Sequence, residues 1–434
     1  MNLYRSYHKR KLRIYSFINK VFAPILVRLF SHQGLYSEQL KTAQGEKDDS
    51  YVPLSNRHVA ADESALQLIA FYLPQFYPFE VNDKSWGKGF TEWTNVSKAV
   101  PQFRGHYQPR LPGELGFYDL RIEDVQKRQI ELARQHGIYG FCYYHYWFAG
   151  KRVMEKPVQQ ILANKELDLP FCLCWANENW TRHWDGGDEN ILLQQEHSPR
   201  DDIEFIQEIE RLLKDSRYIR INGKPLLILY RPMLLPDPAA TARRWREYAR
   251  ENDIGELYIV GVAAVGFSDY EQIGFDGLVE FPPHNIKNHD ISVRKTFYNL
   301  DFRGEVLDYT RAAAESLSNL NPGQKVFPGV MMEWDNEARK PGKGVVYHGC
   351  TPDIYQQWLD AACHYVIENK AQDERFVFIN AWNEWAEGTY LEPDRKYGYA
   401  YLNATANVVE KYSRIAETSC KVDNEAIDRR SLMH

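Results

Sequence analysis

The sequence predicts an α/β fold, a (β/α)8 barrel that forms one domain. From residue 67 onward, eight short runs rich in β-branched and aromatic residues recur along the chain. Most of these runs are almost continuously apolar, as strands buried on both faces must be. Longer segments of helical period lie between them. The 434 residues suffice for one such barrel with a long first loop.

The predicted elements alternate in chain order. The eight strands span Gln67–Leu73, Tyr139–Tyr146, Phe171–Trp175, Pro225–Tyr230, Leu257–Ala263, Gly277–Glu280, Val326–Met332 and Phe376–Trp382. The helices between them span Ile122–His136, Pro199–Asp215, Ala239–Glu251 and Asp353–Glu368. A doubly wound open sheet is the alternative. That fold places a Gly-rich turn after its first strand, whereas this chain has Leu73-Pro74-Gln75-Phe76 there.

Both ends of the chain differ in composition from its centre. Residues 1–32 form a predicted basic amphipathic extension, because residues 1–30 carry seven Lys and Arg, no acid, and apolar residues at helical spacing. This pattern favours a helix lying in an anionic membrane surface, with a disordered or core-docked extension as the alternative. Residues 33–62 are predicted to be a linker, residues 63–415 the barrel domain and residues 416–434 a C-terminal tail.

Composition and charge exclude several classes of protein. The net charge is −6 although the extension is basic, so the body is acidic and unsuited to nucleic acid. No run approaches the ~20 apolar residues of a membrane-spanning helix. The six cysteines form no CxxC pair, so we expect a cytoplasmic protein, with peripheral association at the inner membrane face through residues 1–30. Without HxH, HExxH or EF-hand spacing, we expect neither a metal nor another cofactor.

Polar and aromatic residues gather just after the predicted strands, where a barrel places its functional face. Most of the 11 tryptophans fall in these loops. Aromatic rings beside carboxylates are typical of a carbohydrate cleft, because the rings stack on sugars while the acids bind hydroxyls or move protons. The predicted substrate-binding residues are Gln75, Trp86, Glu92, Trp93, His145, Trp147, Trp175, Asn177, Glu178, Trp180, Arg231, Glu280, Glu333, Trp334, Trp382, Asn383 and Trp385.

The segment after the last strand contains two glutamates, Glu384 and Glu387, three positions apart and followed by Gly388. Glycosidic chemistry needs such a pair, in which one carboxylic acid protonates the leaving oxygen and the other carboxylate acts as base or nucleophile. Two close carboxylates also move each other's pKa values apart. Glu384 and Glu387 are therefore the predicted catalytic residues.

The segment Asn383-Glu384-Trp385-Ala386-Glu387-Gly388-Thr389 resembles the Asn-Glu-Trp-His-Glu-Gly-Thr motif of glycoside hydrolase family 99, the endo-α-mannosidases. About residues 66–399 are similar to the family 99-like proteins of bacterial O-antigen and capsule loci, many of which are labelled glycosyltransferases. The blocks that carry this similarity are Ala70–Phe76, Gly89–Asn95, Gly140–Trp147, Trp175–Trp180 and Asn380–Asp394.

The resemblance implies a (β/α)8 barrel and retaining hydrolysis through a 1,2-anhydro sugar. In that mechanism Glu384 would deprotonate the substrate 2-hydroxyl, and Glu387 would act first as acid and then as base. Ala386 departs from the His of the endo-α-mannosidase motif, and the first loop also differs, so the resemblance does not by itself imply mannose specificity.

The sequence thus predicts an endo-acting retaining glycoside hydrolase whose substrate is a bacterial surface polysaccharide or its precursor. The alternative is a glycosyltransferase of O-antigen, capsule or lipopolysaccharide biosynthesis, although the chain has no DxD and no Gly-rich phosphate loop. A non-catalytic glycan-binding protein is a third class, which the glutamate pair disfavours. Fold class alone does not separate these functions.

Overall fold

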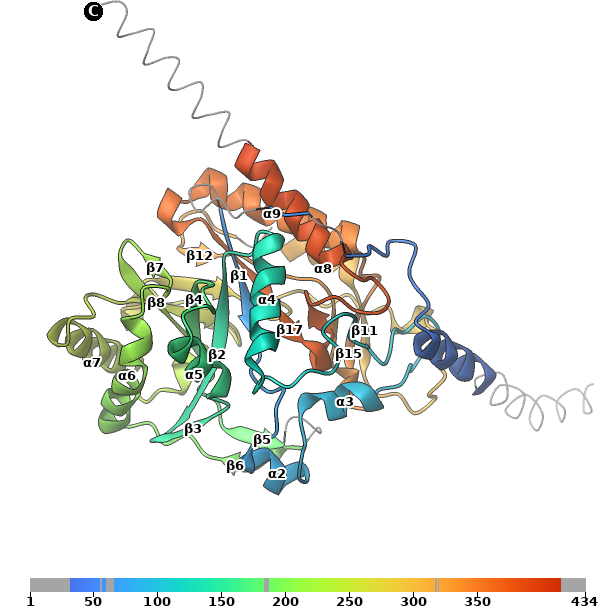
Figure 1. Ribbon diagram of the computed structural model, residues 1–434, viewed down its shortest axis with the longest axis horizontal. Helices are drawn as coiled ribbons and strands as arrows, with labels where there is room; N and C mark the ends of the chain where they lie inside the picture. Colours follow the sequence, from blue (N-terminus) through green and yellow to red (C-terminus); the bar gives the residue numbers. More distant parts are fainter. Residues whose placement is uncertain are drawn as a thin grey trace, which may run out of the picture.

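The computed structural model describes residues 32–54, 57–59, 66–182, 187–316, 318 and 320–414, and the side chains of residues 182–190 are outside the description. The predicted basic extension therefore lies outside the described residues up to residue 31, as does the predicted tail at 416–434. Figure 1 shows strands at the centre and helices around them.

The strands form a parallel barrel that follows the chain in order. They are β1 (Gln67–Tyr72), β2 (Gly140–Phe148), β4 (Phe171–Trp175), β8 (Lys224–Leu229), β9 (Tyr258–Ala263), β10 (Gly277–Glu280), β12 (Val326–Phe327), β13 (Gly329–Met331) and β16 (Phe376–Asn380). Strands that follow one another in this order pair with each other, except β12 and β13, and β16 pairs with β1. The predicted (β/α)8 barrel is confirmed.

The seventh predicted strand is split in two by Pro328. Its first half, β12, pairs with β10, and its second half, β13, pairs with β16. Proline has no N–H to donate to a ladder, so a break at this position is expected. The Pro328 carbonyl accepts a hydrogen bond from the Phe378 N–H at 2.9 Å, so the chain stays attached to β16 at the break.

Helices cover the outside of the barrel. They are α4 (Glu123–Gln135), α5 (Lys156–Ala163), α6 (Pro199–Leu213), α7 (Pro238–Glu251), α8 (Tyr309–Ser316) and α9 (Pro352–Asn369), followed by a helix at residues 400–414. The starts of α6, α7 and α9 are specified locally: the side chains of Ser198, Asp237 and Thr351 cap them, and a proline opens each helix.

Short helices, strands and 3-10 turns lie in the loops of the barrel. Two short helices, α2 (Glu80–Trp86) and α3 (Glu92–Lys98), lie in the long first loop. The remaining strands are β3 (Lys151–Val153), β5 (Trp180–Arg182), β6 (Gly187–Leu193), β7 (Arg220–Ile221), β11 (Glu305–Asp308), β14 (Trp334–Asp335), β15 (Val345–His348), β17 (Asn383–Glu384) and β18 (Thr389–Tyr390). Short 3-10 turns include η6 (Asn336–Ala338) and η8 (Trp385–Glu387).

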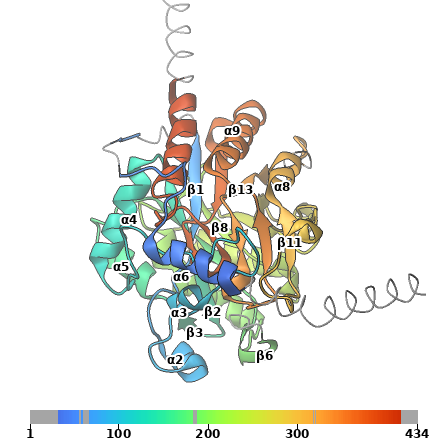
Figure 2. The ribbon, with the colours of Figure 1, turned by 90° about the vertical axis from the view of Figure 1, so that its right-hand side faces the viewer.

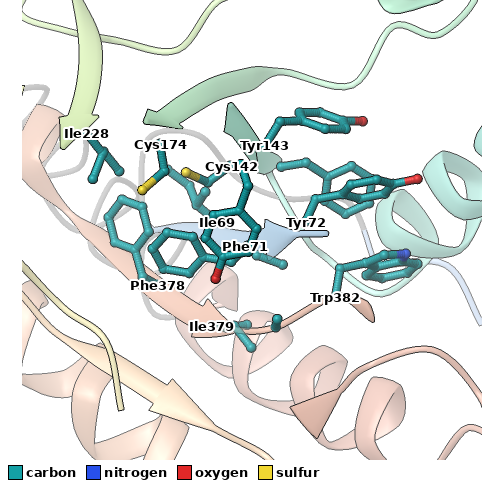
Figure 3. Close-up of a cluster of buried hydrophobic side chains, with 14 of the residues drawn as sticks. Ile69, Phe71, Tyr72, Cys142, Tyr143, Cys174, Ile228, Phe378, Ile379 and Trp382 are labelled. Atoms are coloured by element: carbon teal, nitrogen blue, oxygen red, sulfur yellow. The ribbon is translucent and has the colours of Figure 1, made fainter. Parts of the chain in front are cut away.

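The two faces of the barrel wall carry different side chains. In the parallel register Phe71 is paired with Cys142, and Tyr144 with Cys174, so these side chains share the inner face. Figure 3 shows Phe71, Cys142 and Cys174 close together, with Tyr72 to one side of them. The neighbouring Tyr72 lies on the outer face, where its hydroxyl donates to Oε1 of Gln129 on α4 at 2.8 Å. Buried strands thus keep the two-residue alternation although both faces are apolar.

Part of the predicted linker is ordered against the barrel. Residues 32–44 form a helix, drawn in blue at the front of Figure 2. Further along, Val52 makes a β-bridge to Gly398 and Val59 makes one to His136. The stretch at 33–62 therefore contains a helix and two attachment points. Within the described part of the chain, no helix is both long and apolar enough to span a bilayer.

Candidate active site

The two predicted catalytic glutamates lie in a tight loop that follows β16. Glu384 ends β17 and Glu387 ends η8. Gly388 then adopts a left-handed conformation with φ of 64°, and β18 returns antiparallel to β17. A Cβ on Gly388 would lie 3.0 Å from the backbone N of Asp335, so the turn also needs glycine for space. The loop that carries both glutamates therefore packs closely against the loop that contains Asp335.

Arg339 joins the two glutamates to a third carboxylate. Its Nη2 donates to Oε2 of Glu384 at 2.9 Å, and its Nη1 donates to Oε1 of Glu387. Its Nε and Nη2 donate to Oε2 of Glu92 at 2.9 and 2.5 Å. Arg339 is only 4% exposed. The structure thus brings Glu92, Glu384 and Glu387 together around a guanidinium that the sequence analysis missed, although Arg339 follows the predicted seventh strand by a few residues.

The proton affinities of these groups differ from those of free side chains. Burial raises the pKa of Glu384 to about 8, against the charge of Arg339, while the charges of Glu387 and Glu92 raise it further. Burial and the neighbouring carboxylates thus make Glu384 a stronger base than a free glutamate, while Arg339 favours its ionised form. Burial also raises the pKa of Tyr146 well above its usual value, and the charge of Glu384 adds to this effect. The Tyr146 ring on the inner face of β2 thus lies near the glutamates.

A second group of side chains forms another part of the site. The Tyr230 hydroxyl lies 3.0 Å from Nε2 of His284, and Arg231 is paired with Glu178. Burial lowers the pKa of His284, while the nearby charges of Glu387 and Glu178 oppose this shift. The imidazole is therefore neutral at neutral pH. Glu178 and Arg231 were among the predicted substrate-binding residues, whereas Tyr230 and His284, which follow the fourth and sixth predicted strands, were not.

The loop after β13 contains a buried network of its own. Both oxygens of Glu333 are bonded within the protein, one by Arg110 and the other by the Tyr401 hydroxyl at 3.1 Å. Asp335 is bonded by Nε2 of His106 at 2.8 Å and by Gln108 at 2.7 Å. Burial opposes ionisation of Asp335, but His106 and Arg110 outweigh it and lower the pKa to about 2.

This network explains the placement of Glu333 and Trp334. Glu333 was predicted to contact substrate, but its carboxylate is committed to Arg110 and Tyr401 and supports the loop that carries Arg339. Trp334 is buried in the same loop.

Among the described residues, no group of three or more His, Cys, Asp or Glu is arranged to hold a metal ion.

Five predicted substrate-binding residues lie on the outer face of the barrel wall. Trp175 stacks on Phe205 of α6 with ring centroids 4.2 Å apart. His145 is paired with Trp175 in the register, and Nε1 of Trp147 donates to Asp201 at 2.7 Å. The others are Trp382, which packs on Phe141, and Glu280, whose neighbour Phe281 fills the barrel interior against Phe71.

The prediction of sugar contact is therefore corrected for His145, Trp147, Trp175, Trp382 and Glu280. The physical reason is the two-residue period of a strand, which sends neighbouring side chains to opposite faces. In β2 the inner positions belong to Tyr144 and Tyr146, the residues on either side of His145. For Glu280, the half-buried carboxylate accepts from the Gly329 N–H at 3.2 Å, and desolvation raises its pKa to about 7.

Other predicted residues hold the loops in place. Asn383 exchanges hydrogen bonds with the backbone of Leu73 at 2.7 and 3.0 Å, and Asn177 does the same with Arg231 at 2.8 and 2.9 Å. The remaining aromatic residues pack as follows: Trp385 stacks on Tyr390 with centroids 3.8 Å apart, Trp93 donates to the Tyr118 carbonyl, Trp86 stacks on Phe90, and Trp180 packs edge-on against Tyr146. Gln75 is fully buried after β1, with neither side-chain polar atom bonded to a described residue.

The outer position of Trp175 leads to a prediction. Trp175→Ala should lower the free energy of unfolding by about 3–5 kcal/mol, because it removes a buried ring that packs on Phe205 and Trp245. Its effect on KM, measured for the folded fraction, should be small. Denaturant unfolding and steady-state kinetics on one preparation test both statements. A large rise in KM with unchanged stability would place this ring in the substrate cleft instead.

The chain matches one described protein family over most of its length. Residues 68–405 match the family described as Glycosyltransferase WbsX. Uncharacterized protein WxcX of Xanthomonas campestris pv. campestris strain ATCC 33913 is 47% identical over 353 residues, which is 81% of this chain and 51% of that protein. WxcX of strain B100 is 46% identical over 369 residues, 84% of this chain and 53% of that protein. The chain thus spans about half the length of the curated relatives it matches.

Solved structures with this fold include two glycoside hydrolase-like barrels. The GH99 endo-alpha-mannosidase from Bacteroides thetaiotaomicron has a TM-score of 0.50 at 17% identity, covering 82% of this chain and 100% of that one. A glycoside hydrolase-like protein has a TM-score of 0.52 at 14% identity, covering 83% and 98%. At these identities the similarity concerns the fold. The match over residues 68–405, by contrast, shows the family: the chain belongs to the family described as Glycosyltransferase WbsX.

Proposed function

We propose that this chain is a carbohydrate-active enzyme, an endo-acting retaining glycoside hydrolase whose substrate is a bacterial surface polysaccharide or its precursor. One observation carries the proposal: Arg339 holds Glu384 and Glu387 side by side at the C-terminal end of a barrel strand. This is the end of a (β/α)8 barrel where catalytic residues lie. Two carboxylates with different environments supply the acid and the base that glycosidic cleavage needs.

In the proposed reaction the substrate supplies its own nucleophile. Ionised Glu384 removes the proton of the sugar 2-hydroxyl, and O2 attacks the anomeric carbon to form a 1,2-anhydro sugar. Glu387 protonates the leaving glycosidic oxygen as its bond to the anomeric carbon breaks. Glu387 then deprotonates a water that attacks the same carbon, the bond between that carbon and O2 breaks, and Glu384 returns its proton to O2. Two inversions give net retention, and no bond forms between enzyme and sugar.

A glycosyltransferase is the second candidate, because the matching family is described as one. The two reactions differ in what they consume. Incubating the purified protein with the polysaccharide of its host, with and without nucleotide sugars, separates them by product. Release of reducing ends without a donor supports the hydrolase. Chain extension that requires a donor and releases no reducing ends would instead establish the transferase.

The basic extension is proposed to bind anionic membrane surfaces. Deleting residues 1–30 removes seven Lys and Arg and the accompanying apolar residues. The deletion should release the protein from vesicles rich in anionic lipid and leave its activity on soluble substrate intact. Sedimentation with anionic and neutral vesicles measures this difference. Equal vesicle binding with and without the extension would show that it is not the anchor.

A further inference from the structure

Glu92 is the one carboxylate around Arg339 that comes from the first loop of the barrel. It lies on α3, 247 residues away from Arg339 in the chain, and it is fully buried. Its Oε2 accepts from Nε and Nη2 of Arg339, and its Oε1 accepts from Nδ2 of Asn95 at 2.9 Å. Both oxygens are therefore bonded within the protein, which suits Glu92 to anchoring Arg339 rather than to contacting substrate.

The guanidinium of Arg339 is planar, so the hydrogen bonds to Glu92 orient the whole group. Its five N–H donors are fixed in one plane, so the position of one edge determines the direction of the rest. Glu92 takes the edge formed by Nε and Nη2. Nη2 also donates to Glu384 and Nη1 donates to Glu387, in the hydrogen bonds described above. The loops that carry Glu92, Arg339 and the two glutamates are thus held in fixed relative positions, although they are distant in sequence.

We propose that Glu92 and Arg339 form a positioning pair, in which Glu92 orients Arg339 and Arg339 holds the carboxylates of Glu384 and Glu387 in fixed relative positions and sets the balance of charge around them. The roles of the two glutamates rest on the proposed function. Glu92 and Arg339 act through them without reacting with the sugar.

The charges that face Glu384 determine the direction of each effect. They come from Arg339 after η6, Glu387 on η8 and Glu92 on α3, and the phenols of Tyr144 and Tyr146 lie nearby on β2. The negative charge of Glu92 raises the pKa of Glu384, and the positive charge of Arg339 lowers it. Neutralising Glu92 should therefore lower the pKa of Glu384, whereas neutralising Arg339 should raise it.

The test is a carboxyl titration of the full chain with 13C-labelled glutamate, followed by NMR. The resonance of Glu384 is assigned by its loss in Glu384→Gln. Glu92→Gln should move its titration down by about one pH unit, and Arg339→Gln should move it up by a similar amount. Because the base must be ionised to act, the acid limb of the kcat/KM profile should move in the same directions.

Two controls separate positioning from a general loss of structure. Glu92→Asp keeps the charge and should restore most of the original titration. Arg217→Gln removes a largely buried guanidinium that is paired with Asp215, outside the network around Glu384, and it should leave the Glu384 titration unchanged. If Arg339→Gln does not fold, the titrations of Glu92→Gln and Glu92→Asp are sufficient to test the positioning pair.

Two results would overturn the positioning pair: an unchanged or raised Glu384 titration in Glu92→Gln, or shifts of the same sign in the Glu92 and Arg339 variants. The titration needs no substrate, so its outcome does not depend on whether the enzyme is a hydrolase or a transferase. Suppose that the titration moves down in Glu92→Gln and up in Arg339→Gln, but the protein releases no reducing ends. The positioning pair would then stand, and the hydrolase assignment would be wrong.

Discussion

Replacing Glu384 with glutamine is expected to abolish turnover, with a loss of about 10⁴-fold for ordinary glycosides and for substrates with activated leaving groups alike. The reason is that Glu384 generates the nucleophile. Without its carboxylate, O2 keeps its proton and cannot attack the anomeric carbon, whatever the leaving group. Initial rates on an aryl glycoside and on the polysaccharide measure the two losses.

The matched control lies in the same loop. The carboxylate of Glu392 is equally buried, but it accepts from Trp385 at 2.6 Å, Gln129 at 2.6 Å and Tyr118 at 2.9 Å. Glu392→Gln should lose stability while the folded enzyme keeps its activity. If Glu384→Gln recovered activity on activated substrates, Glu384 would be an acid rather than the base.

The same role of Glu384 determines how the enzyme should respond to substrates altered at C2. A 2-deoxy or 2-fluoro sugar has no hydroxyl to supply the nucleophile, so it should neither react nor label the protein. Mass spectrometry of the intact chain checks this statement. A glycosyl adduct on Glu384 would establish a direct carboxylate nucleophile and remove the anhydro-sugar route, while leaving the hydrolase assignment in place.

Replacing Glu387 with glutamine is expected to give the opposite dependence on the leaving group. Ordinary glycosides need a proton on the departing oxygen, so their cleavage should fall by about 10²–10⁴-fold. Substrates whose leaving group departs without protonation should lose much less in the first step. A series of aryl glycosides with leaving groups of graded pKa measures the difference as a steeper dependence of kcat/KM on that pKa.

The interpretation of Glu387→Gln depends on Arg339. Its Nη1 donates to Oε1 of Glu387, and a glutamine side-chain oxygen can accept the same hydrogen bond. The variant should therefore keep the geometry of the site while losing the transferable proton. Equal losses across the whole series of leaving groups would remove Glu387 from the role of acid.

The sequence alone determined much of the fold and of the central site. Buried parallel strands must be apolar on both faces, so their runs stand out from the amphipathic helices between them. The predicted ends of Phe171–Trp175 and Gly277–Glu280 agree with β4 and β10. Glu384 and Glu387 were predicted to be neighbours because they are three positions apart in a turn that Gly388 closes, and the structure places both on Arg339.

Only the tertiary structure decided which side chains of each strand face the site. In β2 every residue from Tyr143 to Trp147 is aromatic or histidine and all are buried, so hydropathy carries no trace of the alternation. Register with the neighbouring strands turns Tyr144 and Tyr146 inward and His145 outward. The convergence of Glu92 and Arg339 was equally hidden, because residues 247 positions apart meet only when the barrel closes and brings its loops to one end.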